Sequence, residues 1–307
     1  MIKNKLLKDI YFGSELEKLR QGSASTQDIM KKSDPIFQEL TARDWGRIEN
    51  IVSGFFSKPL RGKFGGPITA GDAFFMAAFM SAMQPKGMLE VGVCSGVSSA
   101  FILYAADKLG LLKPGKTFLQ SVDLLKYHGE EGHEVGRVVG MNYPSLAENW
   151  KLHTGTTTPE LVFDSNDFKD AIDDLGATLA FIDANHMHPW PALDVLSISK
   201  LLPAQSWIMM QDVQLMERWL ANCVELGVPS PKPCRGVNVS TLLWPGTKIS
   251  GWDMCYNMSA LKLDVANAQY EDFIGKVKTY PAETGEGQAQ KCFSYLDRFD
   301  FTNGSIA

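Results

Sequence analysis

The chain has 307 residues, of which 30 are basic and 35 acidic, and its formal net charge is -5. Hydrophobic residues make up 45% of the chain and charged residues 21%, a balance that supports a buried core and excludes a disordered chain. The charges are spread along the sequence without a basic stripe, so we expect neither nucleic acid nor an anionic membrane surface as a partner.

The cysteines are odd in number and widely spaced, and none belongs to a Cys-x-x-Cys pair. They are Cys94, Cys223, Cys234, Cys255 and Cys292. This pattern argues against a disulfide framework and against a zinc cluster. The N-terminal run carries positive charge but no long apolar stretch, and no later stretch has the length of a membrane span. We therefore expect a cytoplasmic protein that does not enter a membrane.

Residues 1–66 are expected to form a helical extension, because apolar residues between Leu16 and Ile51 recur at roughly helical spacing. The turn-rich run Arg61-Gly-Lys-Phe-Gly-Gly-Pro ends the extension and marks a domain boundary. Beyond it, Thr69 is expected to cap a strongly apolar helix from Ala73 to Met83. The extension shows no chemistry of its own and would either cap a site or form the interface of a homodimer.

From Met88 onward, short apolar runs alternate with helical patterns. The expected strands are Met88–Gly92, Thr117–Asp123, Lys151–Thr154, Thr178–Asp183 and Trp207–Asp212. Continuous apolar strands separated by helices indicate a parallel sheet that is covered on both faces. The predicted fold class is therefore α/β, a doubly wound, mostly parallel sheet, which binds ligands beyond the carboxyl ends of its strands.

The last third of the chain is less regular. A helix is expected over Gln214–Leu226, followed by several prolines, and Trp252–Leu263 has the pattern of a late, partly antiparallel strand. From Glu283 the sequence is rich in Gly, Gln and Ala before an aromatic end. These features predict a central domain over residues 67–282 and a C-terminal tail over residues 283–307.

The run from Leu89 to Ser99, Leu-Glu-Val-Gly-Val-Cys-Ser-Gly-Val-Ser-Ser, follows an apolar strand and precedes the helix expected over Ala100–Leu109. Gly92 and Gly96 would let the backbone turn tightly beside a ligand, and the helix N-terminus supplies free N–H donors. These glycines do not have the Gly-x-Gly-x-x-Gly spacing of dinucleotide-binding proteins, so a bound pyrophosphate is less expected.

This glycine loop resembles the first motif of class I S-adenosylmethionine-dependent methyltransferases through Glu90-x-Gly92-x-x-x-Gly96. The following Ser98-Ser99 is similar to the version in metal-dependent O-methyltransferases of the caffeoyl-CoA and catechol type. The resemblance extends over about Pro67 to Val213. It implies that Glu90, Gly92, Gly96 and Ser98 belong to the cofactor site, where this loop holds the methionine part.

By the same resemblance, Asp123 at the end of the second strand would bind the ribose hydroxyls of S-adenosylmethionine. The loop His153-Thr-Gly-Thr-Thr would lie near the adenine, which makes Thr154 and Gly155 cofactor-binding candidates. Asp183 is a further candidate for this site. In a competing interpretation, the glycine loop and Asp123 are ordinary strand-to-helix joints, but the order of the motifs along the chain favours the cofactor site.

Two strands that are expected to be neighbours end with Asp183 and Asp212. Adjacent strands lie about 4.8 Å apart, so the two carboxylates would converge, and they repel unless a proton or a cation lies between them. Oxygen ligands suit a hard ion. We therefore expect Mg²⁺ or another divalent cation at Asp183 and Asp212. In the competing interpretation, each aspartate only caps the helix that follows it.

The aspartate pair also resembles the caffeoyl-CoA-type enzymes, in which both strands end with metal-binding aspartates. Those enzymes have Asn directly after the second aspartate, whereas this chain has Val213, which leaves the third ligand open. Asp183-x-x-His186 is instead similar to an element of antibiotic-sugar O-methyltransferases, in which the histidine is the general base. Asp183 and His186 are therefore the expected catalytic residues, and the neighbouring His188 is expected to be structural.

The sequence thus predicts methyl transfer from S-adenosylmethionine to a hydroxyl of a small molecule such as a sugar, a phenol or another natural product. An unactivated hydroxyl is a poor nucleophile, so a base and a metal would both contribute. Three alternatives stay open: a metal-independent N- or O-methyltransferase, a nicotinamide-dependent oxidoreductase, and a non-catalytic cofactor-binding scaffold. The polar stretch Lys126–Glu134 is either a lid or a solvated loop, and Trp190 either packs in the core or lines a substrate wall.

Overall fold

The structure is a computed structural model that describes residues 35–41, 44–62, 68–128, 132–213, 224, 227, 234–250 and 257–301. The first half of the expected N-terminal extension lies outside these residues, as do most of the turn-rich joint after Arg61 and nearly all of the helix expected over Gln214–Leu226. Cys223 and Cys255 also lie outside them.

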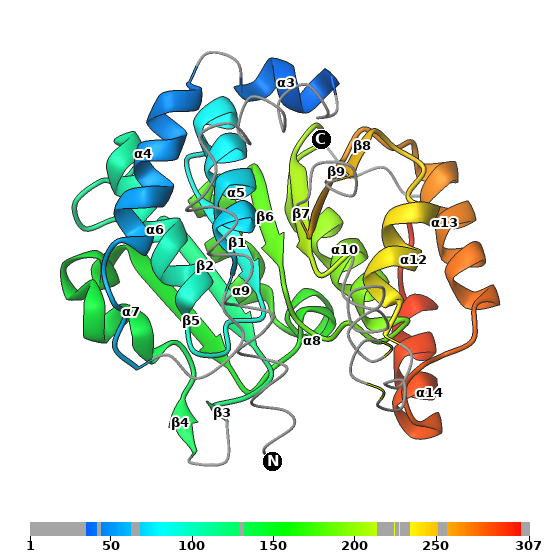
Figure 1. Ribbon diagram of the computed structural model, residues 1–307. Coiled ribbons are helices and arrows are strands. Elements are labelled where there is room, and N and C mark those ends of the chain that lie inside the picture. Colours follow the sequence, from blue (N-terminus) through cyan, green and yellow to red (C-terminus); the bar gives the residue numbers. More distant parts are fainter. Residues whose placement is uncertain are drawn as a thin grey trace.

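Among the described residues, seven strands form one sheet in the order β5-β2-β1-β6-β7-β9-β8 (Figure 1). They are β1 (Met88–Val91), β2 (Leu119–Asp123), β5 (Trp150–Thr154), β6 (Leu179–Ile182), β7 (Trp207–Gln211), β8 (Lys248–Ser250) and β9 (Met258–Lys262). The first five run parallel, whereas β9 is antiparallel to β7 and β8. The expected α/β fold with a mostly parallel sheet is confirmed, and the late strand is antiparallel as expected.

The strand order reverses at β1, which has β2 on one side and β6 on the other. Val91, the last residue of β1, is in register with Val122 in β2 and with Ile182 in β6. The segments that follow these three positions therefore emerge side by side at the carboxyl edge of the sheet. Such a reversal opens a crevice outside the strand ends, which is where doubly wound sheets bind ligands.

Helices cover both faces of the sheet (Figure 1). On one face lie α3 (Pro35–Thr41), α4 (Trp45–Phe56), α5 (Ala70–Met83), α6 (Val97–Leu109) and α7 (Arg137–Asn142). On the other face lie α8 (Thr158–Asp164), α9 (Asn166–Leu175), α10 (Trp190–Leu201), α12 (Gly236–Leu243), α13 (Asn267–Thr279) and α14 (Glu286–Leu296). Successive strand residues point to opposite faces, so Met88 joins the first core and Leu89 the second.

Helix α5 is buried on nearly every side, because it packs against α3, α4 and α6 and shares a hydrophobic core with one face of the sheet. Thr69 caps it as expected, since its hydroxyl accepts a hydrogen bond from the backbone N–H of Asp72, and the Asp72 carboxylate accepts one from the N–H of Thr69. The helix begins at Ala70, earlier than the expected Ala73. The described part of the N-terminal extension thus shares the core of the central domain.

The C-terminal segment also belongs to a core. Helix α14 packs against α10, and the buried side chains of Cys292, Tyr295 and Phe301 lie in the same cluster as Leu89 of β1. Two ion pairs attach this segment to α8, Lys291 to Glu160 and Arg298 to Asp164. The aromatic end that the sequence shows therefore packs into one covering layer of the sheet.

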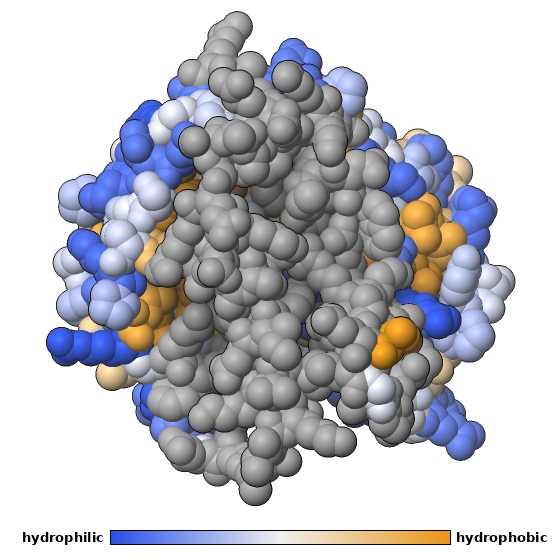
Figure 2. Space-filling view, viewed as in Figure 1, coloured by the Kyte–Doolittle hydropathy of each residue, from blue (hydrophilic) through white to orange (hydrophobic). Residues whose placement is uncertain are grey.

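The polar stretch after β2 contains a two-stranded hairpin, β3 (Tyr127–His128) and β4 (His133–Glu134). Leu124, Leu125 and Tyr127 at its base are exposed. Elsewhere on the face shown in Figure 2, the described surface is mostly hydrophilic, with hydrophobic patches between the polar residues. In the part of the chain that the structure describes, no helix combines the length and the apolar character needed to cross a membrane.

Candidate active site

The glycine loop turns sharply directly after β1. Gly92 has a φ of 86°, and a Cβ atom there would stand 1.9 Å from the backbone oxygen of Asp183. Gly96 has a φ of 87°, and a Cβ atom there would stand 2.7 Å from Cα of Gly136. Both positions combine a left-handed conformation with a close backbone approach, so both require glycine. The loop is thereby fixed between β6 on one side and the start of α7 on the other.

Asp123 closes this loop from the end of β2. Its Oδ2 accepts hydrogen bonds from the backbone N–H groups of Val93 and Cys94, at 2.9 and 3.0 Å. Its Oδ1 accepts one from the N–H of Leu125 at 2.8 Å. A carboxylate oxygen can accept more than one hydrogen bond, so these contacts leave capacity for a ligand hydroxyl.

A cavity of about 350 Å³ opens over the carboxyl ends of β1, β2 and β6. Gly92, Asp123 and Asp183 line it, so the structure brings three of the predicted cofactor residues to one concave surface. Its wall continues through Thr156, Thr157, Thr158, Trp190, Asp194 and Gln288. A cavity of this size suits a small ligand or cofactor.

Glu90 and Ser98 do not reach this cavity. Val91 lines it, and its neighbour Glu90 points to the opposite face of β1, where the side chain is fully buried. The Glu90 carboxylate accepts hydrogen bonds from the hydroxyls of Ser98, Ser99 and Ser121. Burial raises the pKa of Glu90 to about 7, although the three hydroxyls act to lower it. In this structure Glu90 therefore joins β1 to α6 and to β2 through serine hydroxyls, on the side of β1 opposite to the cavity.

The other cofactor candidates lie next to the cavity rather than in its wall. Gly96 begins α6, where it packs against Gly136. Thr154 is the last residue of β5, in register with Asp123, and the N–H of Gly155 donates to the backbone oxygen of Asp123 at 2.9 Å. The loop after β5 thus reaches the cavity through the residues that follow Gly155.

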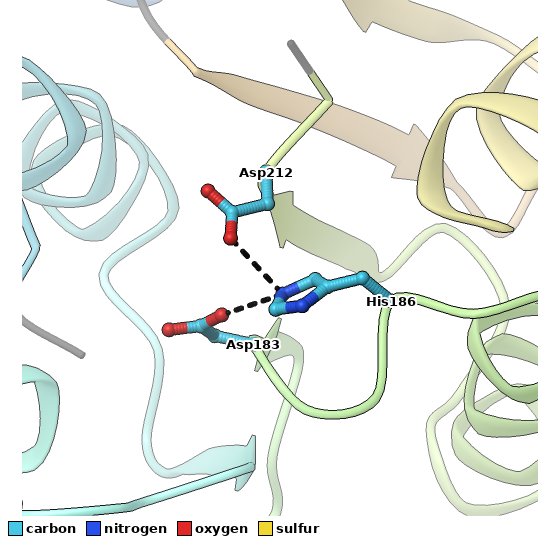
Figure 3. Close-up of side chains that lie close together, drawn as sticks. All are labelled: Asp183, His186 and Asp212. Atoms are coloured by element: carbon cyan, nitrogen blue, oxygen red, sulfur yellow. Dashed lines mark hydrogen bonds and ion pairs between the residues drawn. The ribbon is translucent and has the colours of Figure 1, made fainter. Parts of the chain in front are cut away.

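Asp183, His186 and Asp212 form a compact cluster at the ends of β6 and β7 (Figure 3). His186 Nε2 lies 3.0 Å from Oδ1 of Asp183 and 3.2 Å from Oδ2 of Asp212. Asp212 has a φ of 69°, a left-handed conformation that is uncommon outside glycine. Since Asp183 also lines the cavity, the cluster and the cavity share one carboxylate.

The charges of the cluster depend on one another. Burial acts to lower the pKa of His186, but its hydrogen bond to Asp183 and the charges of Asp212 and Asp183 raise that pKa to about 9. Burial and the neighbouring carboxylates of Asp183 and Asp72 raise the pKa of Asp212 to about 7, against the lowering effects of His186 and Asn257. At neutral pH a protonated His186 therefore balances the charge of the aspartates.

The position after the second aspartate holds no ligand group, because Val213 is an apolar and buried residue. Instead, one donor atom from each of Asp183, His186 and Asp212 lies within 4.8 Å of the other two. His186 is therefore the residue available as the third ligand, which the sequence left open. His188 lies apart from the cluster, buried with its Nε2 3.0 Å from the backbone oxygen of Val277. Asp183, His186 and Asp212 are thus the described residues that could hold a metal ion together.

Asn257 is a site residue that the sequence did not reveal. Its side-chain amide donates a hydrogen bond to Oδ1 of Asp212, and its backbone oxygen accepts one from the N–H of Asp212. The contact arises because β9 pairs antiparallel with β7, which places the residue before β9 beside the residue after β7. No local pattern in the sequence signals this pairing.

A family model described as a methyltransferase domain matches residues 89–213, which contain the glycine loop, Asp123 and both aspartates of the cluster. None of the curated proteins searched matches this chain. The matched residues form the part of the sheet in which the strand order reverses, with the glycine loop and Asp123 at the switch point. This part of the chain is therefore similar to a methyltransferase domain.

Several solved structures are similar to this chain. A cofactor-bound protein, Rv0187 from MTB, is 16% identical with a TM-score of 0.42 and covers 71% of this chain and 90% of its own. The O-methyltransferase TomG from Streptomyces achromogenes, in complex with SAM, is 17% identical with a TM-score of 0.38, covering 70% and 89%. An O-methyltransferase from Bacillus cereus, in complex with SAH, is 14% identical with a TM-score of 0.40, covering 76% and 99%.

Proposed function

We propose that this protein is an S-adenosylmethionine-dependent methyltransferase that acts on a hydroxyl of a small molecule, with a divalent cation at Asp183 and Asp212 and with His186 as the base. The observation that carries the proposal is the cluster of two carboxylates and an imidazole, one member of which also lines the cavity. The net charge of -5 argues for a small acceptor such as a sugar, a phenol or another natural product rather than a nucleic acid.

The donor set fits a divalent cation. Two carboxylate oxygens suit a hard divalent ion such as Mg²⁺ or Mn²⁺. The protein already balances the aspartates with one positive charge, that of protonated His186. A cation in the same place would offset the same repulsion and would supply positive charge that lowers the pKa of an acceptor hydroxyl.

The transfer itself is an in-line displacement. The acceptor oxygen attacks the methyl carbon, the bond from that carbon to sulfur breaks, and S-adenosylhomocysteine leaves with the electron pair. The chain contributes orientation, because the rate depends on a collinear arrangement of oxygen, carbon and sulfur. The glycine loop and Asp123 position the cofactor in the cavity next to Asp183, which belongs both to the cavity wall and to the cluster.

His186 accepts the proton that the acceptor hydroxyl loses. Its imidazole reaches both aspartates from the loop between β6 and α10, so it lies beside Asp183, which lines the cavity. A base must be neutral before it accepts a proton, whereas the two aspartates hold the pKa of His186 at about 9. A cation bound at these carboxylates places a second positive charge beside His186. This charge lowers the pKa of His186, so the imidazole returns to its neutral form near pH 7.

The test measures cation binding and turnover separately. Calorimetry with Mn²⁺ in the presence of S-adenosylhomocysteine should show one site in the wild type and at least about tenfold weaker binding in Asp212→Asn, because one anionic ligand is lost. Asp272→Asn is the matched control, since Asp272 is an exposed aspartate on α13. Normal Mn²⁺ binding by Asp212→Asn would contradict the assignment of this ligand.

Turnover is followed as S-adenosylhomocysteine released from S-adenosylmethionine with a panel of catechols, flavonoids and sugars. We expect activity that excess chelator abolishes and Mn²⁺ or Mg²⁺ restores. His186→Ala should keep its Mn²⁺ affinity but lose roughly 10²–10⁴ in rate, the usual contribution of a positioned base. Full activity in excess chelator would favour metal-independent methylation, and a loss of Mn²⁺ affinity in His186→Ala would make His186 a ligand.

A further inference from the structure

The loop that carries His186 is held by parts of the chain that the proposed mechanism does not use. His186 lies between β6 and α10, and its ring stands between the two carboxylates of the cluster (Figure 3). The loop belongs to neither a helix nor a strand, so no regular ladder of hydrogen bonds fixes its backbone. The direction of the imidazole therefore depends on the groups that bind the backbone of this loop.

Glu283 binds the loop from a distant part of the sequence. It lies between α13 and α14, and its Oε2 accepts a hydrogen bond from the backbone N–H of His188 at 2.9 Å, across 95 positions of the chain. The backbone N–H of Glu283 donates to the backbone oxygen of His188 at 3.0 Å. One residue thus binds both the N–H and the carbonyl of His188, two positions after the imidazole of the cluster.

The same carboxylate also binds the segment that leads into α12. Oε1 and Oε2 of Glu283 accept hydrogen bonds from the N–H of Arg235 at 3.1 and 2.9 Å. The next residue, Gly236, donates from its N–H to the backbone oxygen of His186 at 2.9 Å. Hydrogen bonds to a charged acceptor are the stronger ones in proteins. Glu283 therefore joins the loop to the start of α12.

The loop and α12 approach each other backbone to backbone. A Cβ atom on Gly236 would stand 2.6 Å from the backbone oxygen of His186 and 2.6 Å from the backbone nitrogen of His188. Only glycine allows such an approach without a shift of one of the two segments. The carboxylate of Glu283 and this close packing are two separate contacts that fix the backbone on which the imidazole stands.

We propose that Glu283 is a positioning residue for His186. Its carboxylate fixes the backbone of the loop, and the loop holds the imidazole between Asp183 and Asp212, where the ring can receive the proton of the acceptor hydroxyl. Glu283 does not line the cavity, so it acts through His186 and not on the cofactor. This inference rests on the proposed role of His186 as the base, but the position of the ring can be measured without turnover.

An NMR titration of the His186 imidazole in excess chelator measures that position, and His186→Gln identifies the signal. Although burial lowers the pKa of His186, the neighbouring aspartates raise it to about 9. Glu283→Ala should release the loop, so this pKa should fall to about 8 or lower, toward the ordinary 6.5. Glu283→Gln keeps an oxygen that can accept from both backbone N–H groups, and it should keep the pKa of the wild type.

Turnover tests whether the position matters for the reaction. With saturating S-adenosylmethionine and the best acceptor of the panel, Glu283→Ala should lower the rate about 10- to 100-fold, because a displaced base is a poor one. Glu283→Gln should stay within about fivefold of the wild type, since a neutral acceptor is weaker than a charged one. In a His186→Ala background, Glu283→Ala should cause almost no further loss, because the group that it positions is gone.

Two further variants complete the experiment. Gly236→Ala displaces the same loop from α12, so it should lower the pKa of His186 and the rate as Glu283→Ala does, and it decides if Glu283→Ala does not fold. Glu286→Ala is the matched control, because it removes an exposed carboxylate in the first turn of α14. It should change neither the pKa of His186 nor the rate.

An unchanged pKa of His186 in a folded Glu283→Ala variant would overturn the proposal, and this titration decides alone if no acceptor of the panel is turned over. An equal rate loss in the His186→Ala background would show that Glu283 acts elsewhere. A loss of S-adenosylhomocysteine affinity as large as the loss of rate would make Glu283 a support of the cavity wall and would also overturn the proposal. If His186→Ala keeps the wild-type rate, the base assignment fails and the proposal falls with it.

Discussion

The glycine loop and the cluster of Asp183, His186 and Asp212 lie on neighbouring strands but balance their charges in different ways. In the glycine loop, the protein supplies every partner: three serine hydroxyls donate to Glu90, and three backbone N–H groups donate to Asp123. In the cluster, two carboxylates share one imidazole. The first region is therefore preorganised by the fold, whereas the second depends on a proton or a cation, which is where chemistry is expected.

The largest effect should come from Gly92→Ala, which attacks the preorganised region. The substitution adds the cost of a left-handed conformation, about 1–2 kcal/mol, to the cost of a Cβ atom 1.9 Å from the backbone oxygen of Asp183, about 1–3 kcal/mol or more. We expect a loss of roughly 2–5 kcal/mol in the free energy of unfolding, measured by urea denaturation, and loss of S-adenosylhomocysteine binding.

Gly110→Ala is the control for this substitution. Gly110 has a similar φ of 75°, but no atom lies within 4 Å of the added Cβ. It should cost only the conformational part, about 1–2 kcal/mol, and leave cofactor binding unchanged. Equal effects of the two substitutions would show that the close approach between β1 and β6 is unimportant for the loop.

The pH dependence of stability should distinguish the two regions next. The folded protein raises the pKa of His186 to about 9 from an ordinary value of 6.5, so protonation of His186 stabilises the folded state below pH 6.5. This contribution is lost as pH rises through 9. In excess chelator, the wild type should lose up to about 3 kcal/mol from this source, at about 1.4 kcal/mol per pKa unit.

Urea denaturation between pH 7.5 and 9.5 measures the larger part of this loss, about 2 kcal/mol. This pH window lies above the pKa of about 7 of Glu90 and of Asp212. Protonation of these two carboxyls contributes to stability at lower pH, and that contribution is lost as pH rises toward 7. His186→Gln should flatten the dependence, because its side chain cannot be protonated in this range. A slope that persists in His186→Gln would assign the titration to another group and remove the ion pair with the aspartates from the account.

The sequence predicted the fold and the sharp turn of the glycine loop because these signals are local. Glycine spacing, an apolar strand and the helix that follows lie within one short run, Leu89–Ser99. The orientation of Glu90 can also be predicted from the sequence, because side chains alternate along β1 and Glu90 therefore points to the face opposite to that of Val91.

Other site features depend on tertiary contacts that a single sequence does not show. Asn257 meets Asp212 only because β9 inserts beside β7 in antiparallel orientation. Trp190 was open to a core or a wall interpretation, and only the fold shows that the residue lines the cavity while its indole nitrogen is buried without an acceptor among the described residues. The expected ion and the role of His186 stay predictions, because both depend on a bound partner.

The most direct test of the account is calorimetric titration of S-adenosylhomocysteine into the wild type and Asp123→Ala. Asp123 lines the cavity, and we propose that it accepts hydrogen bonds from the ribose hydroxyls, so the substitution should weaken binding by about 1.5–3 kcal/mol, roughly a factor of 10 to 150. Asp272→Ala, a surface change on α13, should bind as the wild type does. No binding by the wild type, or unchanged affinity in a folded Asp123→Ala variant, would contradict the assignment of this cavity to the cofactor.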